Sequence, residues 1–577
     1  MAGDTLDIQH LLNPDNLAAE ISNKFQSWVS LRNGWLEEKK ELRNYVFATD
    51  TRTTSNSKLD WFNSTTTPKL TGIYDTLKAL YSSALFPSQH WLRWEGEDRE
   101  SNIKDKRDTI QGYMETKLRQ SSFETMADRL IDDYVLYGNA FATVEWVEEV
   151  HETELGETIA TFIGPRLVRI SPYDIVFDPT AASFQRAPKI TRALVSLGEA
   201  QKRVEAGDAK YQTVFDTMMA NRRTVASSSS FDKSDAFIAD GFSSIEHYYG
   251  SDYIEILTFY GDIYDINEGV LKQNYKIVVA DRAYVIEEGP NSNWLGESAI
   301  YHAGWRNRPD NLYAMGPLDN LVGMQYRIDH LENLKADVFD QIAFPVMKIK
   351  GSVESFNFAP GTQIRLGEDG DVSYMTPDTT ALNADFQIRA LEDKMEELAG
   401  APRQAIGIRT PGEKTAFEVS TLDNASNRIF QHKAMKMERE FFQPLLTAML
   451  ESARRNMDIS DTIRVSDEAL NVQIFKDITK EDIKGNGKLR PVGASHFAER
   501  AQRVQNIVQL SQVKQDPSVA PHLSGKLTAE IIANELGEPA LYGENIAIQE
   551  QLETQKASQN AEAENLDELT MQAEIGL

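Results

Sequence analysis

Two amphipathic helical segments that flank a short β-rich insert constrain the fold of this chain more than any other feature. From Gly316 to Ile342, apolar residues recur at helical spacing with charged residues between them, which predicts a helix about 40 Å long at 1.5 Å per residue. Pro345 ends this pattern. Ala384 to Leu398 has the same periodicity on a very acidic background, and Gly400 is its expected C-terminal stop.

The insert between these helices, residues 343–383, has the pattern of short strands. The candidates are Val346 to Lys350, Gln363 to Leu366 and Val372 to Met375, the last two around a turn at residues 367–370. About 40 residues are too few for an independent hydrophobic core. We therefore expect the insert to pack on another surface, with copies of itself as the favoured partner.

The first 310 residues mix helical and strand patterns. Helical spacing dominates the first 150 residues, and Gly138 and Asn139 end a helix before a strand pattern begins. The strand candidates are Ala140 to Val147, Arg166 to Ile170, Tyr253 to Tyr260, and Lys276 to Ala280 paired with Ala283 to Glu287 across an Asp281-Arg282 turn. Because these segments do not alternate as βαβ units, we predict an α+β fold that is predominantly helical.

A loop rich in glycine and proline, residues 401–414, leads into an exceptionally long helical segment, residues 415–456. Thr415 and Glu418 form a capping box at its start. Pro444 predicts a kink, because proline removes a backbone hydrogen bond and clashes with the preceding turn. Two further helices are expected within residues 496–560, followed by a disordered tail over residues 561–577.

Composition limits the classes of function. The chain has 60 Lys and Arg against 88 Asp and Glu, a net charge of −28, which is the opposite of what tight binding to nucleic-acid phosphates requires. It has no cysteine, so disulfides, thiolate metal sites and a cysteine nucleophile are excluded. No apolar stretch approaches the ~18 residues of a membrane span. We expect a soluble protein without membrane contact, metal or cofactor.

Three motifs resemble functional sites, and each has a more ordinary explanation. Gly407 to Thr415 resembles a phosphate-binding loop, but an acidic residue precedes the lysine and no buried strand precedes the loop. The carboxylates of residues 384–398 lack a neighbouring histidine and are typical of a solvated helix face. The stretch Leu85 to Trp94 favours a turn with Trp91 and Trp94 buried over a base-stacking surface. No catalytic constellation is present, so we expect no enzyme.

Five segments between residues 80 and 540 carry a family resemblance through their order and spacing. They are residues 84–93 (ALFPSQHWLR), 132–144 (DDYVLYGNAFATV), 172–179 (PYDIVFDP), 409–418 (RTPGEKTAFE) and 440–446 (EFFQPLL). Together with the order of helix, β insert, helix, loop and long helix, they resemble the portal, or head-to-tail connector, proteins of tailed double-stranded DNA bacteriophages. The short-tailed-phage connectors are the most similar group.

The resemblance implies a portal-type ring subunit with wing, stem, clip and crown. The implied parts are a wing of residues 1–310 with 457–495 returning to it, stem helices at 311–342 and 384–400, a clip at 343–383, a tunnel loop at 401–414, a long kinked helix at 415–456 and a crown at 496–560.

The resemblance also implies function and partners. A ring of twelve copies would form at one capsid vertex of the virion, after assembly in the host cytoplasm, and would conduct double-stranded DNA during packaging and ejection. Its partners would be other copies of itself, the terminase large subunit that supplies energy from ATP, a tail adaptor protein, and the major capsid and scaffolding proteins. Another virion scaffold or adaptor protein, and a metal-dependent nuclease, are the alternatives.

The same resemblance assigns three groups of site residues. Cations of the tunnel loop would contact DNA in the channel: Arg403, Arg409 and Lys414. Acidic residues of the second stem helix would line the channel and repel phosphates: Glu392, Glu396 and Glu397. Acidic residues of the clip would contact terminase or the adaptor: Glu368, Asp369 and Asp371.

Overall fold

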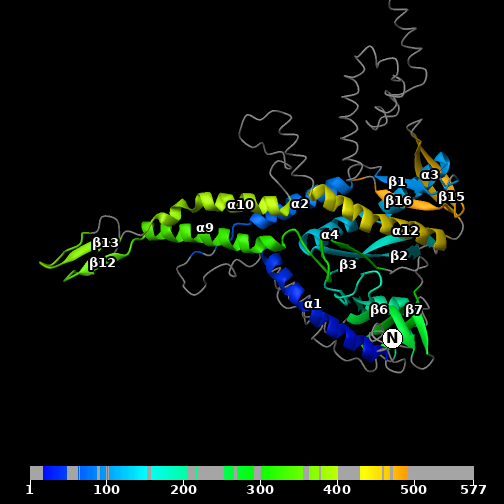
Figure 1. Ribbon diagram of the computed structural model, residues 1–577, viewed down its shortest axis with the longest axis horizontal. Coiled ribbons are helices and arrows are strands. Elements are labelled where there is room, and N and C mark those ends of the chain that lie inside the picture. The colour runs from blue at the N-terminus through cyan, green and yellow to red at the C-terminus, as the bar shows by residue number, and fades with distance from the viewer. Residues whose placement is uncertain are drawn as a thin grey trace, which may run out of the picture.

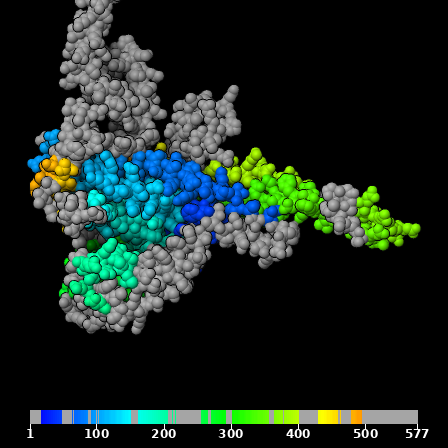
Figure 2. All heavy atoms as spheres, turned by 180° about the vertical axis from the view of Figure 1, so that it is seen from behind, coloured from blue at the N-terminus to red at the C-terminus, as the bar shows by residue number. Residues whose placement is uncertain are grey.

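In the computed structural model, a long arm projects from a broader body (Figure 1), and Figure 2 shows the same arm from behind. All strand pairs among the described residues are antiparallel, which confirms the predicted α+β class. Helices make up about half of these residues and strands much of the remainder, so helix is less dominant than predicted. The structure describes residues 17–47, 63, 65–86, 91–98, 100–101, 103–152, 158–205, 212, 216, 253–265, 269–291, 300–354, 363–375, 378–400, 429–457, 460–467, 472–491 and 493.

A five-stranded sheet lies at the end of the body where α1 (Leu17–Phe47) begins (Figure 1). Its order is β4 (Ile175–Phe177), β5 (Lys189–Ser196), β6 (Tyr253–Asp265), β7 (Val270–Ala280) and β8 (Tyr284–Pro290). Phe25 and Trp28 of α1 pack on one face with Leu257, whereas Ile256 points to the other face beside Ala200 of α5 (Leu197–Glu205). Both faces are thus apolar.

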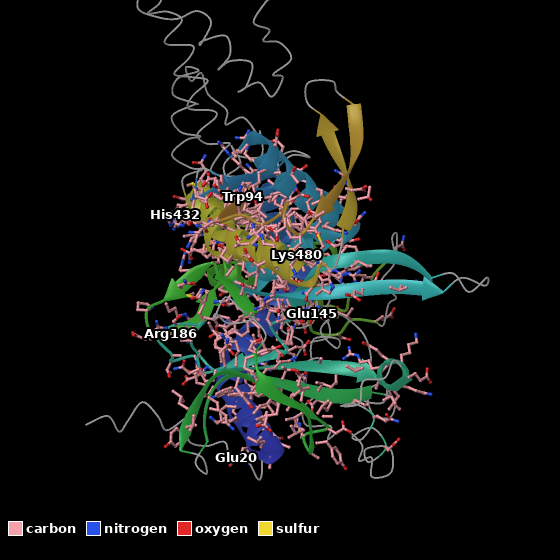
Figure 3. The ribbon with its side chains drawn as sticks, turned by 90° about the vertical axis from the view of Figure 1, so that its right-hand side faces the viewer. Glu20, Trp94, Glu145, Arg186, His432 and Lys480 are labelled. Atoms are coloured by element: carbon pink, nitrogen blue, oxygen red, sulfur yellow. The ribbon has the colours of Figure 1, made fainter. Side chains whose placement is uncertain are left out.

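The larger core lies between a helical layer and the three-stranded sheet β3–β2–β9. Its elements are α2 (Lys69–Leu85), α3 (Lys104–Gln120), α4 (Phe123–Leu136), β2 (Asn139–Glu152), β3 (Thr158–Ile170), β9 (Ile300–Gly304) and α12 (Gln443–Asn456). Figure 3 shows three tiers: helices around Trp94, the β2–β3 hairpin with Glu145, and the five-stranded sheet near Glu20 of α1. The second half of α1 enters this larger core, so a single helix joins both cores.

Several sequence predictions are confirmed to within a few residues. The α4 helix ends before Gly138, whose φ of +70° suits glycine, and β2 begins at Asn139. Asp281 and Arg282 lie in the turn between β7 and β8, both with positive φ, and Ala283 joins them because Ala280 pairs with Tyr284. Trp94 is buried and its indole N–H donates to the carbonyl of Ser101. Trp91 is also buried, as predicted.

The long helix is irregular where Pro444 predicts it. Residues 438–442 form a π-helical turn, η7, directly before α12. Proline has no N–H to donate to the preceding turn, and a π turn accommodates the freed carbonyl. The capping box at Thr415 lies outside the described residues.

The chain then returns to its N-terminal half. The elements are β14 (Ser460–Asp467), β15 (Val472–Thr479) and β16 (Gly487–Pro491), with β16 paired to β1 (Leu92–Gly96). No described helix combines the length and the apolar character needed to cross a membrane. The predicted helices and tail of residues 496–577 lie outside the described residues.

The arm is a helical hairpin that carries a two-stranded ribbon at its tip (Figure 1). Its parts are η4 (Asp319–Leu321), α9 (Val322–Ala343), β12 (Met347–Lys350), β13 (Asp371–Tyr374), η5 (Thr380–Ala384) and α10 (Asp385–Ala399). Both helices match the predicted segments, and Gly400 caps α10 in the left-handed conformation. The predicted strand pairing was wrong in one respect. Leu366 bridges to Val353, and β13 pairs with β12, so the two predicted strands lie opposite residues 347–353 and do not pair with each other across the 367–370 turn.

Candidate assembly surface on the projecting arm

The root of the arm is fixed to the body by a close backbone contact and a buried ion pair. A Cβ atom on Gly138 would overlap the backbone nitrogen of Gly316, so the α4–β2 turn and the start of the arm touch directly. The carboxylate of Asp319 accepts from the Gly316 N–H at 2.8 Å and pairs with Lys39 of α1, whose side chain is buried. Three separate parts of the chain therefore converge at the arm's root.

A ladder of polar side chains on α9 binds residues 63 and 65–68, a non-helical stretch along the arm that we call the extended segment, and also the first turn of α2. Thr67 N–H donates to Asp329 Oδ1 at 2.9 Å, and Leu70 N–H donates to Gln325 Oε1 at 3.1 Å. Asn333 accepts from the Thr65 N–H at 2.9 Å and donates to its carbonyl at 3.0 Å. The ladder consists of residues spaced four apart: Gln325, Asp329, Asn333 and Asp337.

The ladder explains why four polar residues of α9 are buried. Their side chains satisfy backbone groups of the extended segment, as a neighbouring β-strand would. Asp337 completes the outer end by accepting from the Asn63 N–H at 2.7 Å. The signal in the sequence was the i, i+4 spacing of amide and carboxylate side chains, but spacing alone does not identify what they bind.

The two carboxylate oxygens of Asp329 have different surroundings within the ladder. One carboxylate oxygen accepts from Thr67 and from Gln325 Nε2, whereas Oδ2 is buried without a hydrogen-bond partner. Burial raises the pKa of Asp329 to about 6, and the bonds from Thr67 and Gln325 oppose that rise.

The second helix of the arm packs on α9 and on α2. Ile388 and Met395 are buried on its inner face. Lys335 of α9 pairs with Asp385 of α10 at 2.5 Å, and Lys69 of α2 pairs with Glu396 at 2.6 Å. These contacts hold α10 against α9 and against α2 of the body, and the opposite face of α10 stays open.

The tip ribbon has one apolar face and one polar face. Opposite residues of an antiparallel pair point the same way, so Met347 with Tyr374 and Ile349 with Val372 form the apolar face. Ile349 and Tyr374 are 53% and 55% exposed, although both are large apolar side chains. An isolated two-stranded ribbon is at best marginally stable in water. The ribbon therefore presents a surface that a partner would stabilise.

Apolar exposure continues down the arm from the ribbon. Phe386 of α10 is 81% exposed and Phe344, at the end of α9, is 74% exposed. Phe339, Ile342 and Val346 are exposed as well. Soluble proteins rarely leave so many large apolar side chains together in water unless they bind something. We define the arm surface as these five residues with Ile349 and Tyr374.

The predicted acidic residues of the arm occupy different environments. Glu368, Asp369 and Asp371 are exposed near the tip ribbon. Glu397 is exposed on α10 and Glu392 is half-buried.

Glu396 differs from both of its predicted companions. It is buried and paired with Lys69, so it does not share the open face of Glu397. The predicted loop cations Arg403, Arg409 and Lys414 lie outside the described residues.

Comparison with known proteins leaves the arm as the principal guide to function. Neither a scan against protein-family models nor a search of curated proteins found a match for the chain. Among the described residues, no group of three or more His, Asp or Glu side chains is arranged to hold a metal ion.

Proposed function

We propose that this protein is the subunit of a phage portal ring, which conducts double-stranded DNA at one capsid vertex. The observation that carries the proposal is the projecting arm, two helices that bear an amphipathic ribbon whose apolar face is open. A ribbon of this kind gains stability when neighbouring copies cover it, and burial contributes about 1.5–3 kcal/mol for each large apolar side chain. Twelve copies, by the sequence resemblance, would bring twelve ribbons together.

Within this proposal the arm helices are the stem, the tip ribbon is the clip, and the body contains the wing. Glu397 and Glu392 would face the channel and weaken phosphate binding through like-charge repulsion. Glu396 would instead brace α10 through Lys69, since it is buried in its own subunit. Arg403, Arg409 and Lys414 remain the proposed DNA contacts of the tunnel loop.

The proposed partners follow from the same arrangement. The exposed Glu368, Asp369 and Asp371 would meet the terminase large subunit during packaging and a tail adaptor afterwards, at the end of the arm. Capsid and scaffolding proteins would contact the body. The particle would be assembled in the host cytoplasm and retained in the virion.

Electron microscopy of the purified full-length protein tests the proposal directly. A ring with an axial hole is expected, whereas compact monomers or open polymers would contradict it. The arm surface is tested by Ile349→Asn with Tyr374→Asn, which should shift the protein from rings to monomers while leaving its circular dichroism spectrum unchanged. The matched control is Lys348→Asn with Ser373→Asn on the polar face of the same ribbon, which should leave the rings intact.

A further inference from the structure

Three cations gather around the end of β9, in a chain that is acidic overall. Lys433 Nζ donates to the carbonyl of Trp305 at 2.5 Å, and Lys436 Nζ donates to the carbonyl of Gly304 at 2.9 Å. Two consecutive carbonyls therefore hold two ammonium groups side by side. The guanidinium of Arg306 lies 5.0 Å from the centre of the Trp305 ring, and Lys433 Nζ lies 4.6 Å from it. We define the basic cluster as Arg306, Lys433 and Lys436.

The basic cluster is poorly compensated by acidic groups. Within the described part of the chain, Glu440 is the one carboxylate within 4.0 Å of a charged nitrogen of the cluster. It lies 3.9 Å from Lys436 Nζ and is shared with Arg439 at 3.6 Å. A chain with 88 acidic residues has ample means to neutralise three cations. The scarcity of carboxylates here leaves a local positive potential.

Two further basic side chains, Lys189 and His302, lie next to the cluster. Lys189 is buried, and its ammonium donates to the carbonyl of Phe184 at 2.6 Å. His302 lies on the ring of Phe141, with 4.8 Å between ring centres, and is hydrogen-bonded to Asn139. Burial lowers the pKa of Lys189 to about 7, and burial with nearby Lys436 and Lys189 lowers the pKa of His302 to about 3.

Burial and the neighbouring cations both oppose the ionisation of Lys433. Burial lowers its pKa to about 8, and the charges of Lys436 and Arg306 lower it further in the same direction. Keeping a half-buried ammonium beside two other cations costs stability unless an anion binds there. Residues whose ionisation is opposed in this way are concentrated at binding sites in proteins.

We propose that the basic cluster binds phosphate groups of a nucleic-acid backbone. The choice of nucleic acid as the ligand rests on the proposed function, whereas the preference for an anion rests on the cluster alone. The exposed guanidinium of Arg306 presents a planar fork that suits two phosphate oxygens, and the two ammonium groups add point charges beside it. The cluster belongs to the body, since Figure 3 places His432, the neighbour of Lys433, in its helical tier.

A phosphate at this position would also relieve the unfavourable charge of the free protein. Its negative charge would raise the pKa of Lys433, because an opposite charge nearby favours the ionised form. Such a site is compatible with an acidic protein that conducts DNA. A few basic residues among many acidic ones would bind the DNA weakly enough to release it again. Each phosphate contact adds a salt-dependent increment to binding.

The test measures fluorescence anisotropy of a labelled double-stranded DNA of about 30 base pairs with the full-length protein over a series of salt concentrations. Arg306→Gln with Lys433→Gln should weaken binding at least about tenfold and reduce the slope of log affinity against log salt by about 2, since each lost phosphate contact removes about 0.9. The matched control, Arg119→Gln with Arg129→Gln, changes the same charge at exposed sites on α3 and α4 and should change affinity less than about twofold.

A second pair of variants separates loss of binding from loss of folding. Arg306→Lys with Lys433→Arg keeps both charges and should retain most of the affinity, whereas Arg306→Gln alone removes an exposed side chain and should weaken binding without lowering the melting temperature. Equal affinity for the wild type and the double glutamine variant would overturn the proposal.

Electron microscopy of the same samples distinguishes this proposal from the proposed function. If rings form and DNA binding does not depend on the cluster, the phosphate site is refuted and the portal proposal stands. If no rings form but DNA binding depends on the cluster, the reverse holds. If the glutamine variants lose rings but keep DNA affinity, the cluster binds carboxylates of a second copy, and the nucleic-acid proposal is refuted.

Discussion

Asp329 lies in the middle of the polar ladder, and its two carboxylate oxygens have opposite surroundings. Oδ1 accepts two hydrogen bonds, whereas Oδ2 is buried with none. The folded pKa of about 6 exceeds the ordinary value of 3.8. A carboxyl group whose pKa is raised by folding binds its proton more tightly in the folded state. Its contribution to stability is therefore lost as pH rises from the unfolded pKa through the folded one.

Asp329→Asn should stabilise the protein at high pH and have little effect at low pH. Asparagine can keep the acceptor for Thr67 and Gln325 while removing the buried charge. The variant should melt several degrees above the wild type at about pH 8, and the difference should shrink at about pH 5, where Asp329 is largely protonated in the folded protein. Melting temperatures at both pH values test this, and an advantage that does not depend on pH would contradict it.

Gly138 and Gly34 provide a matched pair of glycine substitutions. Gly138→Ala should destabilise the protein by more than about 2 kcal/mol, because φ is +70° and the new Cβ would overlap the backbone of Gly316. Gly34 lies inside α1 with open space where a Cβ would be, so Gly34→Ala should stabilise the folded protein by about 0.5–1 kcal/mol. Chemical denaturation of both variants tests the contrast, and equal effects would refute the close contact at the arm's root.

At the scale of elements, the polar ladder makes one helix act as a strand-like partner for an extended segment. Its rungs repeat every fourth residue, so they follow one side of α9 along its length. Because the segment lies along both the root and the middle of the arm, it ties the arm to the body. The rigidity of α9 should therefore depend on the side chains of the polar ladder, which face the extended segment.

Asn333→Ala should loosen the extended segment without unfolding the body. Asn333 bonds to the N–H, the hydroxyl and the carbonyl of Thr65, so its loss leaves that residue without its partners on α9. Hydrogen exchange of the Thr65 amide should accelerate by at least about tenfold, which corresponds to about 1.4 kcal/mol of local opening. Gln341→Ala, on the same helix, is the control and should leave this exchange unchanged.

The sequence predicts elements better than it predicts their contacts. Periodicity located α9 and α10 closely, and turn chemistry located the ends of α4 and α10, because these signals are local. The ladder and the pairing of β12 with β13 depend on which distant segments meet, and no local pattern records that. Glu396 illustrates the limit, since its acidic neighbours suggest solvent and only the position of Lys69 reveals a buried pair.

At the scale of the whole molecule, net charge and exposed apolar surface have opposite effects on the assembly of copies into a ring. A proposed ring of twelve copies would have a formal charge of 12 × −28, or −336, which opposes assembly through self-repulsion. The exposed apolar residues of the arm surface favour assembly through burial, which salt does not screen. The balance between these two effects should set the conditions under which rings form.

Raising the salt concentration should therefore promote ring formation and weaken DNA binding in the same protein. Between about 0.1 M and about 1 M sodium chloride the screening length falls from about 10 Å to about 3 Å, which reduces repulsion between subunits. Mass photometry should show the ring population increase, and sucrose at matched osmolality should not reproduce the full change. DNA affinity at the basic cluster should fall over the same range, because released counterions drive that contact. If both processes weakened with salt, assembly would depend on ion pairs between copies instead of on the apolar arm surface.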